Sequence, residues 1–194
     1  GDPDLETSLQ LLYQLPQKGV DIIELGLPFS DPMADGPIIQ ASSLRAINNG
    51  ITIANYFDMV RSFRRKDTKT PIIMMGYYNP IFSYGTRRFT EEASRAGIDG
   101  FIVVDLPPEE DEELRIHTKE FGINIIRLVA PTTVGQRLPR ILQDAEGFIY
   151  YVSITGVTGS ASPDFHIIQD HIDEIRTHTD LPIAIGFGIK TASD

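Results

Sequence analysis

Six short apolar segments alternate along the chain with segments of helical periodicity, and this alternation constrains the fold more than any other feature. Each apolar segment is bounded by Gly, Pro or polar turn residues and is followed by at least the start of a helix. Strict alternation predicts a parallel sheet with helical crossovers, because parallel neighbours need such a connection. The predicted strands span residues 20–27, 71–76, 98–105, 123–129, 147–153 and 182–187.

The alternation predicts an α/β fold but leaves open whether the sheet is doubly wound or closed into a barrel. An eight-unit barrel usually needs about 250 residues. This sequence has 194, begins with a helix predicted over residues 1–19 with Asp2 as its cap, and ends at the opening of another helix. A barrel without its first and last strands would give this pattern. In either architecture ligands bind at the carboxyl ends of the strands.

The composition is that of a globular protein and argues against several kinds of partner. Hydrophobic residues make up 41% and charged residues 23% of the sequence. A net charge of -10 disfavours nucleic acid and anionic membrane surfaces as partners. The absence of cysteine excludes disulfides, thiol catalysis and thiolate metal sites, and favours a reducing compartment. No apolar stretch approaches the roughly 18 residues of a membrane span.

The predicted strand 20–27 carries one acid among aliphatic residues. Alternation of side chains puts Glu24 on one face with Val20 and Ile22. No Lys or Arg occurs from residue 19 through residue 37, so nothing in the local sequence neutralises Glu24. Burial of an unpaired carboxylate raises its pKa. A carboxylic acid tuned in this direction suits proton transfer near neutral pH.

The loop after this strand brings a second acid to the same place. Residues 28–36 precede a helix predicted to begin at Pro37, and this loop is longer than the usual connection of about 2 to 6 residues. It delivers Asp35 beside the strand end, so Glu24 and Asp35 could flank one pocket. Two alternatives stay open: Glu24 could pair with a basic residue of another strand, and Asp35 could be a turn residue before Gly36.

Two glycine-rich segments follow the last two predicted strands, at residues 156–159 and 186–188. Glycine lets backbone N–H groups approach an anion closely, and a following helix N-terminus adds a favourable dipole. The two segments therefore predict a phosphate site, although each could also be a plain turn. Neither is a Walker A loop, because no Gly-Lys-Ser/Thr follows. Residues 154–163 are also a candidate lid, because they are small and polar.

Adjacent tyrosines and four histidines complete the candidate residues. Tyr150 and Tyr151 occupy neighbouring positions of a predicted strand, so one faces the pocket side and the other faces the helices. The alternation alone does not choose between them. The histidines fall on predicted helices without the His-Glu-x-x-His spacing, so we interpret them as surface residues and predict no metal site; they are His117, His166, His171 and His178.

The chain resembles the tryptophan synthase alpha chain family over essentially its whole length. ELGLPFSDPMADGPIIQ resembles the family's most specific signature, and GDPD, YYNPIFSYG, DLPPEE, YYVSITGVTG and GFGI occur in the family's order and spacing. The resemblance implies a TIM barrel that cleaves indole-3-glycerol phosphate to indole and glyceraldehyde 3-phosphate in tryptophan biosynthesis. This retro-aldol step needs no metal or organic cofactor. The family's first and last strands lie outside residues 1–194, so we expect a single barrel domain that is incomplete at both ends.

The resemblance also implies roles for single residues. Glu24 matches the family's general acid/base, and Asp35 matches the carboxylate that stabilises the cation on the indole nitrogen. Tyr150 matches the family's supporting active-site tyrosine, which selects it over Tyr151. Further matches place the indole contacts at Ile39, Met75, Tyr77, Ile102 and Leu128, and the glycerol phosphate contacts at Thr158, Gly159, Gly186, Phe187 and Gly188.

A partner and a location are implied in the same way. In the family the alpha chain binds a beta chain in an alpha2-beta2 heterotetramer, indole passes to it through a tunnel, and its pyridoxal phosphate is not bound by the alpha chain. Residues 28–35 would form part of the contact surface. Alternatives are a stand-alone indole-3-glycerol phosphate lyase and a truncated, non-catalytic module that binds a partner. The expected location is the cytoplasm, or the plastid stroma in a plant.

Overall fold

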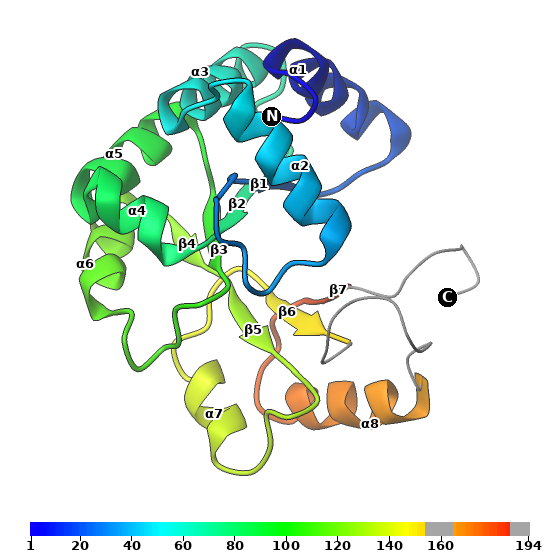
Figure 1. The fold of residues 1–194 in the computed structure, drawn as a ribbon. Coiled ribbons are helices and arrows are strands. Elements are labelled where there is room, and N and C mark those ends of the chain that lie inside the picture. The colour runs from blue at the N-terminus through cyan, green and yellow to red at the C-terminus, as the bar shows by residue number, and fades with distance from the viewer. Residues whose placement is uncertain (154–164, 187–194) are drawn as a thin grey trace. The chain divides into compact units, whose positions relative to one another are not determined.

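The computed structural model describes residues 1–153 and 165–186, with the side chains of residues 165 and 166 left out. The chain divides into two compact units, residues 1–124 and 125–194, and each is described by itself. Figure 1 shows the elements, which in chain order are α1 (Leu5–Gln14), the 3-10 helix η1 (Pro16–Lys18), β1 (Ile23–Gly26), α2 (Pro37–Asn48), α3 (Ile53–Arg64), β2 (Ile72–Gly76), α4 (Tyr78–Tyr84), α5 (Thr86–Ala96), β3 (Gly100–Val103), α6 (Glu112–Phe121), β4 (Asn124–Ile125), β5 (Arg127–Val129), α7 (Arg137–Leu142), β6 (Ile149–Val152), α8 (Phe165–Arg176) and β7 (Ile183–Gly186).

Both sheets consist of strands joined through helical crossovers, as the sequence predicted. The first has the strand order β1-β2-β3-β4 and the second has the order β5-β6-β7. The register is parallel from β1 through β3 and from β5 through β7. The predicted parallel α/β architecture is therefore confirmed. Within the described residues, no helix is both long and apolar enough to span a membrane.

An aromatic cluster packs one face of the first sheet against its helices. The ring of Phe101 on β3 lies 5.3 Å from that of Phe89 on α5, which in turn lies 5.5 Å from Phe57 on α3. All three rings are fully buried. Burial of one such side chain contributes about 1.5 to 3 kcal/mol, so this cluster defines which sheet face belongs to the core. The opposite face of this sheet carries Glu24 and Met75.

The second sheet has its own core. Val129, Ile149 and Tyr151 pack with residues of α7 and α8. The hydroxyl of Tyr151 and Nδ1 of His171 lie 2.9 Å apart, and burial raises the pKa of this tyrosine. Tyr151 is thus the tyrosine that faces a helix. His171 is half-buried and bonded, so its interpretation as a surface histidine was wrong, because helical position alone does not show which face packs on a strand.

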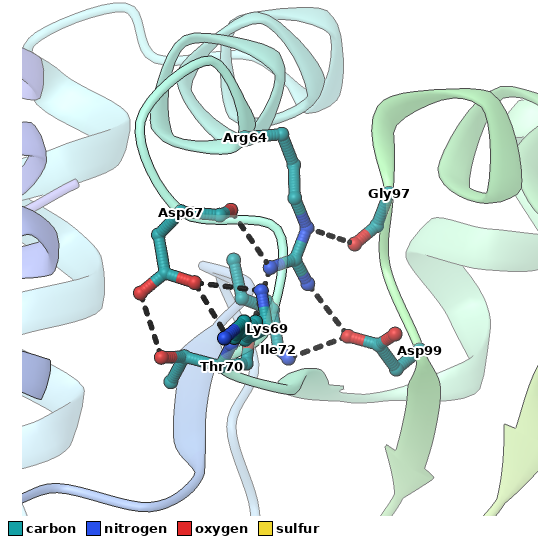
Figure 2. Close-up of polar contacts among 7 residues, drawn as sticks. All are labelled: Arg64, Asp67, Lys69, Thr70, Ile72, Gly97 and Asp99. Carbon is teal, nitrogen blue, oxygen red and sulfur yellow. Dashed lines mark hydrogen bonds and ion pairs between the residues drawn. The ribbon is translucent and has the colours of Figure 1, made fainter.

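The amino-terminal ends of β2 and β3 are joined by the side chain of Arg64, at the end of α3 (Figure 2). Its guanidinium donates to the carbonyl oxygens of Gly97 (2.8 Å) and Thr70 (2.8 Å), and pairs with Asp99 at 2.6 Å. The same Asp99 oxygen accepts from the backbone N–H of Ile72 at 2.8 Å. One half-buried guanidinium therefore connects the starts of two strands to the end of a helix.

Three local expectations were wrong. The helix predicted over residues 1–19 is α1 followed by η1, and its cap is Asp4, whose carboxylate accepts from Thr7 N at 2.7 Å. Asp2 instead pairs with Arg45 through two 2.7 Å hydrogen bonds. The strand predicted over residues 123–129 is two short strands in different sheets, and α4 was not predicted.

Candidate active site

Glu24 lies on the face of the first sheet that does not pack against the aromatic cluster. Its neighbours Ile23 and Leu25 are buried, whereas Glu24 is exposed. The parallel register places it beside Ile73 of β2. The predicted separation of faces is confirmed, but the acid is more exposed than expected. Gly26, the next residue on that face, is exposed as well, and an added Cβ there would meet no atom within 4 Å.

The carboxyl of Glu24 is nevertheless tuned as the sequence suggested. Partial removal of its hydration by the surrounding protein raises the pKa of Glu24. Within residues 1–153 and 165–186, no ion pair offsets this desolvation. The alternative of a Glu24 paired with a basic residue thus finds no partner in the described part of the chain. A raised pKa keeps this carboxyl protonated at higher pH than an ordinary glutamic acid.

Asp35 is held at the end of the loop between β1 and α2. The hydroxyl of Tyr77 donates to Asp35 Oδ2 at 3.0 Å and accepts from the backbone N–H of Ala34 at 2.9 Å. The Tyr77 ring lies 5.3 Å from that of Phe29, in the same loop. Burial, with the carboxylate of Asp35 adding to it, raises the pKa of Tyr77 to about 12. The hydroxyl therefore stays protonated and remains a donor to Asp35.

A cavity of about 320 Å³ opens at the carboxyl ends of β1 and β2. Its volume lies at the lower end of the range for small-molecule sites, which is about 300 to 1,000 Å³. Four of the predicted site residues line it, namely Asp35, Ile39, Met75 and Tyr77. Gly26 lines it too, one position further along the face of β1 that carries Glu24. The cavity thus combines a mostly apolar lining with two carboxylates, those of Asp35 and of Asp2, and Asp2 is paired with Arg45.

The remaining predicted residues fall into three groups. Ile102 is fully buried on β3 and pairs in register with Met75, so the two share a sheet face. In the second unit, Leu128 pairs in register with Tyr150, and an added Cβ at Gly186 would overlap the hydroxyl of Tyr150. These three residues therefore share one face of the second sheet. The other four lie outside the described residues: Thr158, Gly159, Phe187 and Gly188.

Several cavity residues were missed from the sequence. Ser42 and Ser43 of α2 line the cavity together with Ala46. A signal for them existed, because they follow Ile39 at three, four and seven residues and therefore share one helix face. No comparable signal exists for Ala34, which acts through its backbone N–H alone.

The described residues contain no group of three or more His, Asp or Glu side chains that could hold a metal ion. Glu24 is a carboxylate on β1 and Asp35 is a carboxylate in the loop that follows this strand, and Tyr77 adds a neutral donor. Such a set is suited to moving protons and to stabilising a developing positive charge.

Comparison with known proteins gives consistent results. The sequence profile described as tryptophan synthase alpha chain matches residues 1–194. The structure is similar to tryptophan synthase subunit alpha from Legionella pneumophila str. Paris, with 42% identity, a TM-score of 0.89, and coverage of 98% of this chain and 70% of that chain. It is similar to a chain of the tryptophan synthase a2b2 complex from Pyrococcus furiosus, with 40% identity, a TM-score of 0.90, and coverage of 100% and 77%. It is also similar to tryptophan synthase subunit alpha from Campylobacter jejuni, with 40% identity, a TM-score of 0.87, and coverage of 98% of this chain and 76% of that chain.

Proposed function

The chain belongs to the tryptophan synthase alpha chain family, whose members are lyases that cleave indole-3-glycerol phosphate, and we propose that Glu24 and Asp35 perform this cleavage here. Its α/β architecture matches that of the family's TIM-barrel structures. The proposal is carried by the cavity that Asp35 lines, next to a sheet face on which the pKa of Glu24 is raised.

The chemistry requires one proton to be delivered and one to be removed. Protonation of indole C3 places a positive charge on the ring nitrogen. Loss of the proton from the side-chain hydroxyl then forms a carbonyl group, the carbon–carbon bond breaks, and its electron pair neutralises the ring. We assign both proton transfers to Glu24. Its raised pKa supports this role, because a carboxylic acid that titrates nearer to neutral pH can both donate and accept a proton.

Asp35 is assigned to the developing charge on the ring. A carboxylate facing the indole N–H stabilises the cation more than the neutral ring, and this difference lowers the barrier. The apolar cavity lining, which includes Ile39 and Met75, suits a flat aromatic ring and excludes water that would weaken the electrostatic interaction. Ile102 and Leu128 are proposed as further indole contacts.

The phosphate end of the substrate is proposed to bind the glycine-rich segments after β6 and β7. Backbone N–H groups suit a phosphate ester better than side chains in a chain with a net charge of -10. Tyr150 is proposed as a supporting residue, and its contact with Gly186 supports a common site for the two. The proposed contacts are Thr158, Gly159, Gly186, Phe187 and Gly188.

The proposed residues are tested by turnover. Indole release from indole-3-glycerol phosphate should fall by about 10³-fold in Glu24→Gln, because general acid–base catalysis contributes about 10² to 10⁴. It should fall by about 10²-fold or more in Asp35→Asn. Near-wild-type turnover in either variant would remove that residue from the mechanism. Wild-type protein without turnover, alone and with a beta chain, would leave only the non-catalytic alternative.

A beta chain is the proposed partner, in an alpha2-beta2 heterotetramer. The related Pyrococcus furiosus chain belongs to an a2b2 complex. In the present chain the loop between β1 and α2 exposes 78% of Met33, and the adjoining Ile38 is 81% exposed, which supports this region as a contact surface. Adding a beta chain should raise indole release. High turnover that does not change on this addition would favour the stand-alone lyase.

Domain organisation and location stay predictions. We propose that residues 1–194 form one barrel domain, and that the protein acts in the cytoplasm or, in a plant, in the plastid stroma. Limited proteolysis tests the first prediction, and fractionation of the source cells tests the second.

A further inference from the structure

The hydroxyl of Tyr77 acts as both a hydrogen-bond donor and a hydrogen-bond acceptor to the loop that carries Asp35. It accepts from Ala34 N at 2.9 Å, and its own proton goes to Asp35 Oδ2 at 3.0 Å. A hydroxyl whose lone pair is engaged by a backbone donor has its O–H direction largely set. One oxygen of the Asp35 carboxylate therefore accepts a hydrogen bond whose direction is fixed by the Tyr77 hydroxyl.

The position of Tyr77 is itself fixed by burial and by contacts with its neighbours, so its hydroxyl can orient another side chain. Its side chain is only 3% exposed and its ring contacts that of Phe29. It is the N-cap residue of α4, and the next backbone N–H, that of Tyr78, donates to Asp105 Oδ1 at 2.8 Å. Asp105 follows β3, so two strands of the first sheet fix the backbone on which Tyr77 is carried.

The backbone of Asp35 is fixed by other contacts. Its N–H donates to the carbonyl oxygen of Pro32 at 3.1 Å, and its carbonyl accepts from Gln40 Nε2 at 2.8 Å. Only the side-chain torsions of Asp35 are left free by these bonds. The hydrogen bond from Tyr77 restricts them, and so lowers the entropy cost of bringing the carboxylate to its working position.

We propose that Tyr77 is a positioning residue, which orients the Asp35 carboxylate toward the ligand through its hydroxyl. The resemblance implied only that its ring packs around the indole. The inference rests on the proposed function, because it assumes that Asp35 acts on the indole nitrogen. Part of the catalytic effect of Asp35 would then depend on Tyr77, which lies 42 positions away in the sequence.

Tyr77→Phe removes the hydroxyl and keeps the ring, so it separates orientation from packing. We expect kcat for indole release to fall about tenfold, the usual effect of one hydrogen bond to a charged group. KM should change by less than about threefold, because the apolar lining is retained.

A double-mutant cycle gives the decisive result, since a purely structural role would not produce it. In an Asp35→Ala background, Tyr77→Phe should change kcat by less than about twofold, because no carboxylate is left to orient. Single-turnover measurements with excess enzyme keep this slower background measurable.

Tyr84→Phe is the matched control. Its hydroxyl donates to the Glu92 carboxylate at 2.7 Å within the same unit, and neither residue lines the cavity. This variant should retain kcat while losing a similar amount of thermal stability to Tyr77→Phe.

Unchanged kcat in Tyr77→Phe would overturn the inference, and so would an equal loss of kcat in the wild-type and Asp35→Ala backgrounds. Each of these results is distinct from failure of the proposed function, in which Asp35→Asn itself would keep its turnover.

Discussion

Two regions of the first sheet use their acids differently. At the amino ends of β2 and β3, Asp99 pairs with Arg64 and also accepts from Ile72 N. On β1, on the sheet face opposite the aromatic cluster, Glu24 has a raised pKa, caused by desolvation that no described ion pair offsets. Acids of the first kind stabilise the fold, and an acid of the second kind is destabilising but chemically useful. In α/β barrels the carboxyl ends of the strands are also where active sites lie.

Activity and stability should respond in different ways to a substitution at Glu24. The Glu24→Gln variant, with its expected loss of about 10³-fold in turnover, should be at least as stable as wild type at pH 8, because a partly desolvated charge is replaced by a neutral amide. Urea unfolding of both proteins measures this. A clear loss of stability would mean that Glu24 is a structural acid like Asp99.

Arg64→Ala should show the opposite behaviour. We expect the free energy of unfolding to fall by about 2 kcal/mol, since several polar partners, most of them half-buried, lose their donor at once. Turnover at a temperature where the variant stays folded should remain within about twofold of wild type, because the cluster lies at the far ends of the strands.

Arg61→Ala is the control for that experiment. Among the described residues the ion pair of Arg61 is with Asp58, one turn away, and both side chains are exposed. An exposed ion pair contributes about 0.2 to 1 kcal/mol, so stability should barely change. A loss equal to that of Arg64→Ala would show that any charge removed from α3 has this effect.

The smallest expected effect is in the pH dependence of stability. Hydrogen bonds from Thr70, first from its backbone N–H and then from its hydroxyl, hold the pKa of Asp67 below its ordinary value of 3.8. The stability that Asp67 contributes is thus present above that value, and is lost as the pH falls through its lowered folded pKa.

Glu24 contributes with the opposite sign. Its folded pKa is raised from the ordinary value of 4.5, so its contribution is present below that value and is lost as the pH rises through the folded pKa. Unfolding free energies of wild type, Asp67→Ala and Glu24→Gln between about pH 3 and pH 8 should therefore give two difference curves of opposite slope. Equal slopes would contradict the distinction between the acids near Arg64 and Glu24.

Elements with strong local signals were predictable from the sequence. Pro37 begins α2 as expected, and Thr52 caps α3 in a capping box with Asn55. Gly97 ends α5 with a backbone φ of 95°, which favours glycine. These signals act within one turn of helix, so each can be recognised from a few neighbouring residues.

Elements that depend on distant partners were not predictable. Helix α4 has no clear local signal, because Pro80 and several aromatic residues lie within it. The N–H of its first residue donates to Asp105, which is 27 residues away. Ile125 and Arg127 belong to one apolar run but join different sheets. No local pattern distinguishes those two pairings.

In the candidate site, too, some features follow from local sequence and others depend on distant residues. The parallel α/β architecture, the position of Glu24 on the strand face opposite Ile23 and Leu25, and the delivery of Asp35 by a long loop followed from the sequence, because alternation and loop length are local properties. Only the tertiary structure decided that Asp35 is held by the hydroxyl of Tyr77 and that Glu24 keeps contact with solvent. A hydrogen bond between residues of different strands, and the hydration of a side chain, depend on how the chain packs in three dimensions.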